Sequence, residues 1–179
     1  MKNKVQWLCA FAVLGMLLGA TGIAIGNIDK LISKTPGGGI AAAAHAAAPV
    51  VVIDPGHGGE DGGCSAADGT TEKELNLEMS RCITDILNAS GYRTVMTRET
   101  DTLLYDMYGE LSDYRGKKKT YDLKNRLRFA KEANADALIS IHMNKFHQPQ
   151  YSGLQVYYSP NNAESEPLAA KIQEYAEIY

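Results

Sequence analysis

Residues 50–59 read VVVIDPGHGG, and this stretch decides the fold. Its first part, Val50 to Ile53, is a continuous β-branched run, which is typical of a strand buried on both faces. Asp54-Pro55-Gly56 ends the run with residues that favour a turn. The glycines around His57 let the backbone fold tightly there. The stretch therefore predicts a buried strand followed by a loop that carries a histidine.

Helix and strand patterns alternate downstream of this loop. A helix is predicted from Glu72 onward, with Thr70 or Thr71 as its cap and Gly91 just past its end. We expect further strands at 92–97, 137–141 and 154–158, a long loop at 98–120, and further helices at 122–134 and 164–178. The order β-α-β-α-β-β-α predicts a three-layer α/β domain with a mostly parallel, mixed sheet flanked by helices.

Apolar residues at spacings of three and four predict which face of each helix points inward. These residues are Leu75, Met79, Cys82, Ile83, Ile86 and Leu87 in the first helix, Leu123, Leu127 and Ala130 in the second, and Leu168, Ile172 and Tyr175 or Ala176 in the third. Cys82 on such a face is expected to be a buried, inert thiol.

Length and composition place the chain among ordinary globular proteins. It has 179 residues, 45% of them hydrophobic, with 18 basic and 21 acidic side chains and a formal net charge of −3. These values exclude a disordered or collagen-like chain, and three cysteines are too few for a disulfide scaffold. A mildly acidic chain lacks the broad positive field on which nucleic-acid binding depends, so no nucleic-acid partner is expected.

The N-terminal region predicts export. Residues 7–25 carry no charge, and Lys2 and Lys4 precede them, so residues 1–26 are expected to be an apolar helix that is either a signal-anchor or a cleaved signal peptide. We favour the anchor because the run is long. Residues 27–49 are expected to be a flexible Gly/Ala-rich spacer, and residues 50–179 the folded domain. The domain would then be extracytoplasmic, anchored to the membrane or secreted to the cell wall or periplasmic space.

Two histidines follow predicted strands at the sheet edge where α/β proteins bind ligands. His57 follows the first strand and His142 directly follows strand 137–141, while Glu72 lies in the first turn of the helix between them. Two imidazoles and a carboxylate are a common ligand set of catalytic zinc. The alternative is that His57 caps a turn, that His142 is a hydrogen-bonded residue at a strand end, and that the Glu72 carboxylate is placed by its favourable interaction with the helix dipole.

Several motifs in one order resemble the zinc-dependent N-acetylmuramoyl-L-alanine amidases, the cell-wall amidases of the sporulation and cell-separation type. The matching motifs are VVIDPGHGG at 51–59, EKELNL at 72–77, Thr97-Arg98 with Asp101, Asn125-Arg126 with Ala133-Asn134, and SIHMN at 140–144. The combination of the DPGHGG and SIH-x-N elements is specific, whereas either element alone is weak.

The resemblance implies that His57, Glu72 and His142 bind one Zn²⁺. It also implies peptidoglycan as partner and substrate, cleaved at the amide between N-acetylmuramic acid and L-alanine. Asn144 also matches the pattern and is a candidate for substrate binding or for capping a loop, whereas Arg126 is expected to form a structural ion pair.

In this family a further strand with a catalytic glutamate follows the helix that corresponds to 164–178. That glutamate would lie beyond Tyr179, so we expect a domain that is incomplete at its C-terminus. Glu60, Glu164 and Glu166 lie near loops, but the motifs assign none of them this role. Two alternatives to the amidase remain: an impaired module that binds the wall without cleaving it, and a zinc peptidase with the same ligands.

Overall fold

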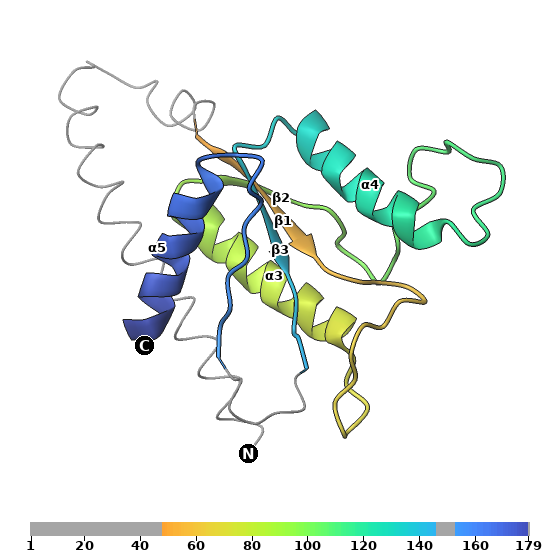
Figure 1. The fold of residues 1–179 in the computed structure, drawn as a ribbon, viewed down its shortest axis with the longest axis horizontal. Coiled ribbons are helices and arrows are strands. Elements are labelled where there is room, and N and C mark those ends of the chain that lie inside the picture. Colours follow the sequence, from red (N-terminus) through yellow and green to blue (C-terminus); the bar gives the residue numbers. More distant parts are fainter. Residues whose placement is uncertain (1–47, 146–152, 179) are drawn as a thin grey trace. The chain divides into compact units, whose positions relative to one another are not determined.

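The computed structural model describes residues 48–145 and 153–178. These two segments belong to two compact units, which are described in turn. The first contains β1 (Val50–Pro55), α3 (Glu72–Ala89), β2 (Arg93–Met96), α4 (Lys118–Glu132) and β3 (Ala137–Ile141), and the second contains α5 (Ser165–Ile178) (Figure 1). None of these helices has the length and apolar character needed to cross a membrane. The predicted apolar helix at 1–26 and almost all of the predicted spacer at 27–49 lie outside the described residues.

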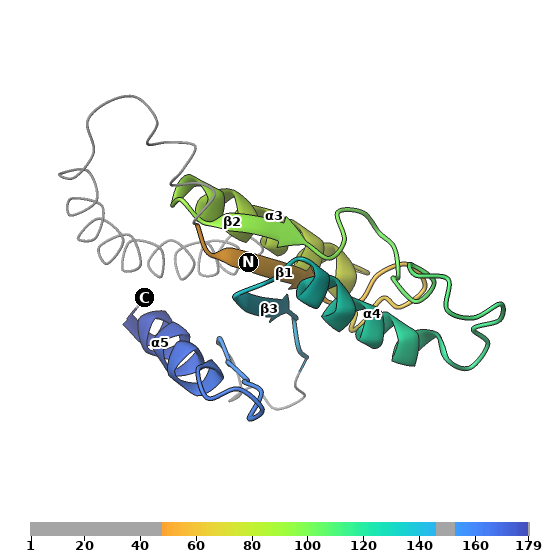
Figure 2. The same ribbon diagram turned by 90° about the horizontal axis from the view of Figure 1, so that it is seen from above.

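The sheet of the first unit has the strand order β2-β1-β3, and all strands are parallel. Right-handed connections place the helices after β1 and after β2 on opposite faces of a sheet with this order. Figures 1 and 2 show α3 and α4 on opposite sides of the strands. The predicted α/β domain with a parallel sheet flanked by helices is therefore confirmed.

The central strand β1 is buried along its whole length, as its sequence predicts. Val51 and Ile53 point to the side of α3, where they form the core with Met96 of β2. Val52 and Asp54 alternate with them and face the side of α4. The strand runs through Asp54 to Pro55, two residues further than predicted, because Asp54 is paired inside the protein and Pro55 occupies the last position of the strand.

Helix α3 begins and ends where the sequence predicts. Thr71 is its N-cap, and the Glu74 carboxylate accepts a hydrogen bond from the Thr71 N–H at 3.0 Å, as in a capping box. At the other end Ser90 is the C-cap, and Gly91 follows with a φ of 87°, in the left-handed region that glycine tolerates.

The buried face of α3 is rotated away from the predicted apolar stripe. Asn76 and Ser80 are fully buried, whereas Leu75 and Cys82 are exposed. The side-chain amide of Asn76 lies inward and donates to the Gly56 carbonyl at 3.2 Å, while Leu77, Ile83 and Leu87 pack on the core. The predictions of an inward Leu75 and a buried Cys82 thiol are therefore wrong.

Helix α4 starts at Lys118, four residues before the predicted start, because Lys117 at its N-cap offers none of the side chains that mark a helix start in a sequence. Its buried residues are Asp122, Asn125, Arg126 and Ala130. Leu123 and Leu127 are 59% and 50% exposed, so their predicted inward positions are wrong. The inward face is polar because Asp122 and Asn125 bind backbone groups of the loop after β2 and Arg126 binds the end of β1, which a hydrophobic pattern cannot reveal.

Strand β3 has the predicted bounds, but its residues alternate between half-buried and exposed, and Leu138 is 42% exposed. The strand therefore packs one face on the core, through Ala137, Ile139 and Ile141, and exposes the other. It pairs with β1 on one edge, and in residues 48–145 and 153–178 no strand lies on its other edge.

The predicted fourth strand at 154–158 is also wrong. This segment is extended without a ladder: Val156 N–H donates to Gln173 Oε1 at 3.2 Å, and Gln173 Nε2 donates to the Leu154 carbonyl at 3.3 Å. These backbone groups bond to a side chain of α5, so the mixed sheet that we expected is a parallel sheet in the described part. In α5, Ala169 is buried and Leu168 is exposed, contrary to the predicted inward Leu168.

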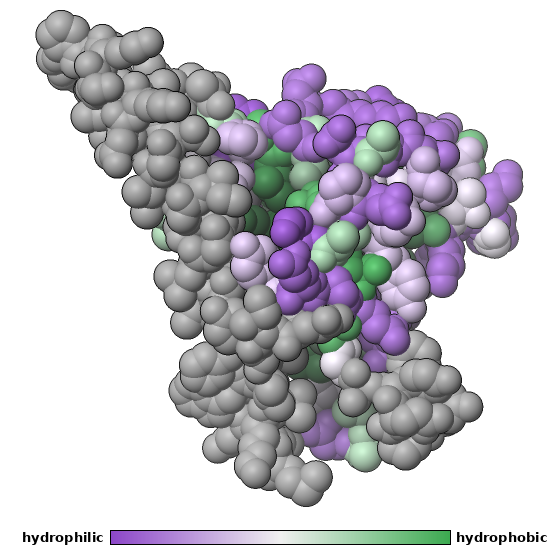
Figure 3. Space-filling model, turned by 60° about the vertical axis from the view of Figure 1, so that its left-hand side comes forward, coloured by the Kyte–Doolittle hydropathy of each residue, from purple (hydrophilic) through white to green (hydrophobic). Residues whose placement is uncertain are grey.

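The described part has a small hydrophobic core and a mostly hydrophilic surface (Figure 3). Figure 3 shows one face of the molecule, where hydrophilic residues cover most of the described surface and smaller hydrophobic areas lie between them. The buried hydrophobic core lies around β1, and the histidine loop begins at the carboxyl end of this strand.

Candidate metal centre

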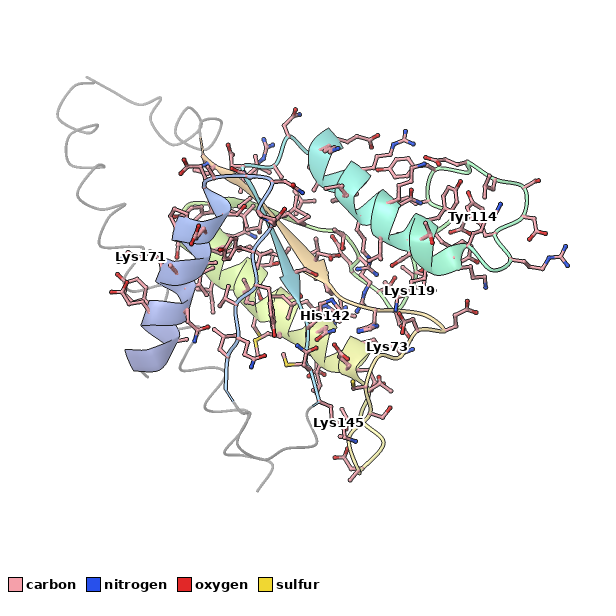
Figure 4. All side chains as sticks on the ribbon, in the orientation of Figure 1. Lys73, Tyr114, Lys119, His142, Lys145 and Lys171 are labelled. Atoms are coloured by element: carbon pink, nitrogen blue, oxygen red, sulfur yellow. The ribbon has the colours of Figure 1, made fainter. Side chains whose placement is uncertain are left out.

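The structure brings His57, Glu72 and His142 together although they are far apart in the sequence. One ligand atom from each residue lies within 4.8 Å of the others. Glu72 Oε1 lies 3.2 Å from His57 Nε2 and 3.0 Å from His142 Nδ1, and the two rings meet edge to face with their centroids 4.9 Å apart. Figure 4 shows His142 beyond the carboxyl end of β3, near the first turn of α3. The predicted convergence is present, and this donor set fits a divalent metal ion such as zinc.

Glu72 is the buried centre of the cluster. Its carboxylate accepts hydrogen bonds from the Cys64 N–H at 2.9 Å and from the Met143 N–H at 3.1 Å. Burial raises the pKa of the Glu72 carboxyl, but these N–H groups, His142 and the nearby His57 lower it to about 2. Glu72 is therefore an anion at neutral pH, as a metal ligand must be.

The glycines of the loop create the space for this cluster. His57 itself has a φ of 62°, in the left-handed region. A Cβ on Gly56 would lie 2.3 Å from Cε1 of His142, and a Cβ on Gly63 would lie 2.6 Å from Oε2 of Glu72. Neither position tolerates a side chain without moving a member of the cluster, which explains why the histidine loop is rich in glycine.

Arg126 of α4 supports the loop from the other face of the sheet. It forms buried ion pairs at 2.7 Å with Asp54 and with Asp122. Its remaining N–H groups donate to the carbonyls of Pro55 and His57, each at 2.8 Å. The prediction that Arg126 forms a structural ion pair is confirmed.

Arg98 supports the same loop after β2. Its guanidinium donates to the Pro55 and Gly56 carbonyls at 2.9 Å each and to the Lys73 carbonyl at 3.0 Å. The carbonyl of Gly56 also accepts from Asn76 at 3.2 Å. The loop that carries His57 is therefore fixed by donors that bind its backbone.

A second set of contacts fixes Gly59. Lys73 Nζ donates to the Gly59 carbonyl and to Asp101 Oδ2, both at 2.6 Å, and Asp101 Oδ1 accepts from the Gly59 N–H at 2.7 Å. Lys73 lies one residue after the ligand Glu72, so the start of α3 and the histidine loop are tied together (Figure 4).

The other predicted site residues lie around this centre. Asn144 is exposed two residues beyond His142, and its proposed role toward substrate stays a prediction. Glu60 is exposed and forms an ion pair with Lys118 at 2.8 Å. A cavity of about 350 Å³ adjoins Glu60 and Asp61. Glu164 and Glu166 belong to the second described segment.

Sequence reasoning missed the residues that hold the ligands in place. Asp61 lies 3.0 Å from His57 Nδ1, and its signal was its position four residues after that histidine. Arg98 and Asp101 lie within the motifs of the resemblance, which gave them no role. Lys73 had no signal other than its place beside Glu72.

Comparison with known proteins agrees with this geometry. The pattern that defines the N-acetylmuramoyl-L-alanine amidases matches residues 51–178. The germination-specific N-acetylmuramoyl-L-alanine amidase of Bacillus subtilis is 35% identical over 125 residues, which is 70% of this chain and 51% of that protein. The chain thus spans about half the length of this relative.

Solved structures are similar as well. The CwlD amidase of Clostridioides difficile, solved in complex with the GerS lipoprotein, superposes with a TM-score of 0.58 at 30% identity, covering 70% of this chain and 66% of that one. The catalytic domain of the amidase CwlV from Bacillus (Paenibacillus) polymyxa gives a TM-score of 0.53 at 30% identity, covering 68% and 59%. The extent of the matched region and the shared fold lead to one conclusion: the chain belongs to the N-acetylmuramoyl-L-alanine amidase family.

Proposed function

We propose that this protein is a zinc-dependent N-acetylmuramoyl-L-alanine amidase, which hydrolyses the amide between N-acetylmuramic acid and L-alanine in peptidoglycan. The observation that carries the proposal is the convergence of His57, Glu72 and His142, whose ligand atoms lie within 4.8 Å of one another. Family membership agrees with it. The substrate is a wall polymer, so we propose an extracytoplasmic location, with residues 1–26 as membrane anchor or export signal.

The chain's own residues prepare the site for this reaction. His57, Glu72 and His142 would hold the ion. Zn²⁺ bound there would polarise the substrate carbonyl and lower the pKa of a bound water toward neutrality. Glu72 supplies the negative charge that offsets part of the ion's charge, and the backbone N–H groups of Cys64 and Met143 hold its carboxylate in place.

The proton acceptor is a separate part of the proposal. The proposed reaction also needs a general base that accepts the proton of the attacking water. In the described part, Glu60 is engaged with Lys118, and no carboxylate there is assigned this role. Asn144, exposed beside the cluster, is proposed to donate a hydrogen bond to substrate.

Metal analysis of the full chain tests the metal centre. We expect about one zinc per chain in the wild type and its loss in His57→Ala and in His142→Ala. His45→Ala, which changes a histidine of the alanine-rich stretch, is the matched control and should retain zinc. A wild type without zinc, or unchanged zinc in the two ligand variants, contradicts the proposal.

Incubation of the full chain with purified sacculi tests the reaction. An amidase releases new L-alanine amino termini. Binding to sacculi without release would support the wall-binding module instead, and cleavage of peptide cross-links would support a zinc peptidase.

A further inference from the structure

The His57 ring lies between two carboxylates. Its Nε2 is 3.2 Å from Glu72 Oε1, inside the candidate metal centre, and its Nδ1 is 3.0 Å from Asp61 Oδ2, on the opposite side of the ring. Both ring nitrogens therefore have a defined partner, and the plane of the ring is fixed by contacts at both ends.

Asp61 is itself held by the loop. Its backbone N–H and carbonyl exchange hydrogen bonds with Gly58 at 3.0 and 2.9 Å, and its Oδ1 accepts from the Gly63 N–H at 3.2 Å. Asp61 therefore presents an acceptor oxygen to His57 from a position that the loop fixes.

A carboxylate can only accept a hydrogen bond, so Asp61 favours the proton of a neutral His57 on Nδ1, whereas Glu72 beside Nε2 favours the other nitrogen. A metal ion takes the lone pair of Nε2, so a ligating His57 carries its proton on Nδ1, next to Asp61. His142 differs, since among residues 48–145 and 153–178 the only carboxylate within ion-pair distance of its ring is Glu72 itself. The two histidines of the cluster are thus oriented by different means.

We propose that Asp61 is a positioning residue that fixes the tautomer and ring plane of His57 for metal binding. Carboxylates that bind the second nitrogen of a ligating histidine raise the basicity of the first nitrogen, and their loss weakens metal binding by about 10–100-fold. The metal part of this inference rests on the proposed function, whereas the tautomer of His57 is a property of the metal-free protein.

Three variants of the full chain test the proposal. Asp61→Ala removes both acceptor oxygens, and Asp61→Asn removes the charge but keeps one oxygen, which can accept from His57 Nδ1 in place of Oδ2. Asp85→Ala, on the exposed face of α3, is the matched control. Zinc dissociation constants come from competition with a chelator, and the His57 tautomer comes from ¹⁵N chemical shifts of the imidazole in the metal-free protein near pH 8.

We expect the zinc dissociation constant of Asp61→Ala to rise about 10–100-fold and its His57 to shift from the Nδ1–H toward the Nε2–H tautomer. Asp61→Asn should keep the Nδ1–H tautomer and weaken zinc less, which a purely structural role for Asp61 would not explain. A wild-type tautomer and zinc constant in Asp61→Ala, or an equal loss in Asp85→Ala, overturns the proposal. If the wild type binds no zinc, the proposed function fails, and the tautomer still decides the role of Asp61.

Discussion

Gly56 lies directly against the ring of His142, so that a Cβ at Gly56 would be 2.3 Å from Cε1 and 2.4 Å from Nε2 of that ring. The loop after β1 and the end of β3 thus approach each other at a position where only hydrogen fits. Gly56 of the DPGHGG motif therefore limits the space available to His142, the proposed ligand of the SIHMN motif.

Gly56→Ala should therefore displace His142 and weaken zinc binding about tenfold or more, with an overpacking cost of about 1–3 kcal/mol in stability. Chelator competition and urea unfolding measure the two effects. Gly62→Ala is the matched control, because its Cβ would meet Thr71 Cγ2 at an ordinary 3.7 Å. Equal zinc constants for the two variants would mean that the ring has room to move.

Arg126→Ala should destabilise the fold by about 3–5 kcal/mol, because it leaves the carboxylates of Asp54 and Asp122 buried without their partner. Urea unfolding measures the change. Arg128→Ala, which breaks exposed ion pairs on the same helix, should have a much smaller effect. Similar losses for the two variants would argue against a structural role of the buried pair.

Asp101→Ala should loosen the histidine loop at Gly59, whose N–H donates to Asp101 and whose carbonyl accepts from Lys73. We expect the Gly59 amide proton to exchange with solvent several-fold faster, while global stability changes little because Asp101 is half exposed. Hydrogen exchange followed by NMR is the measurement. Asp106→Ala on the same loop should leave this exchange rate unchanged, and a similar rate change there would refute the specific contact.

Zinc should stabilise the protein, because the ligands converge only in the folded state. At a free zinc concentration of about 100 times the dissociation constant, we expect a gain of about 2.7 kcal/mol in the free energy of unfolding. Chelation should reverse the gain, and His142→Ala should abolish it. A gain that persists in His142→Ala would indicate that zinc binds elsewhere.

The sequence predicted the strands that carry the site better than the helices around them. β1 and β3 are apolar runs ended by polar residues, and their positions agree with the structure at nearly every residue. The faces of α3 and α4 were predicted only in part: Ile83 and Leu87 pack on the core and Ala130 is buried, but the most buried positions hold polar residues such as Asn76 and Arg126. Periodicity records hydrophobicity, and it cannot detect a side chain that is buried in order to bind a backbone carbonyl.

The candidate centre shows the same division. The positions of His57, Glu72 and His142 at strand ends and at a helix start made them candidates, and the family resemblance singled them out as ligands. Asp61 and Arg98 were not, since each acts on a ligand or its loop through contacts that exist only after folding. The sequence thus shows which residues can bind a metal ion, whereas the residues that hold those ligands in place are identified only in the folded structure.

Arg98 and Arg126 bind the carbonyls of the loop and leave its side chains out of their contacts. These contacts therefore hold the main chain of the loop without involving the side chain at position 57. A substitution at position 57 therefore changes the donor atom offered to a metal ion without removing the contacts by which these two arginines hold the loop.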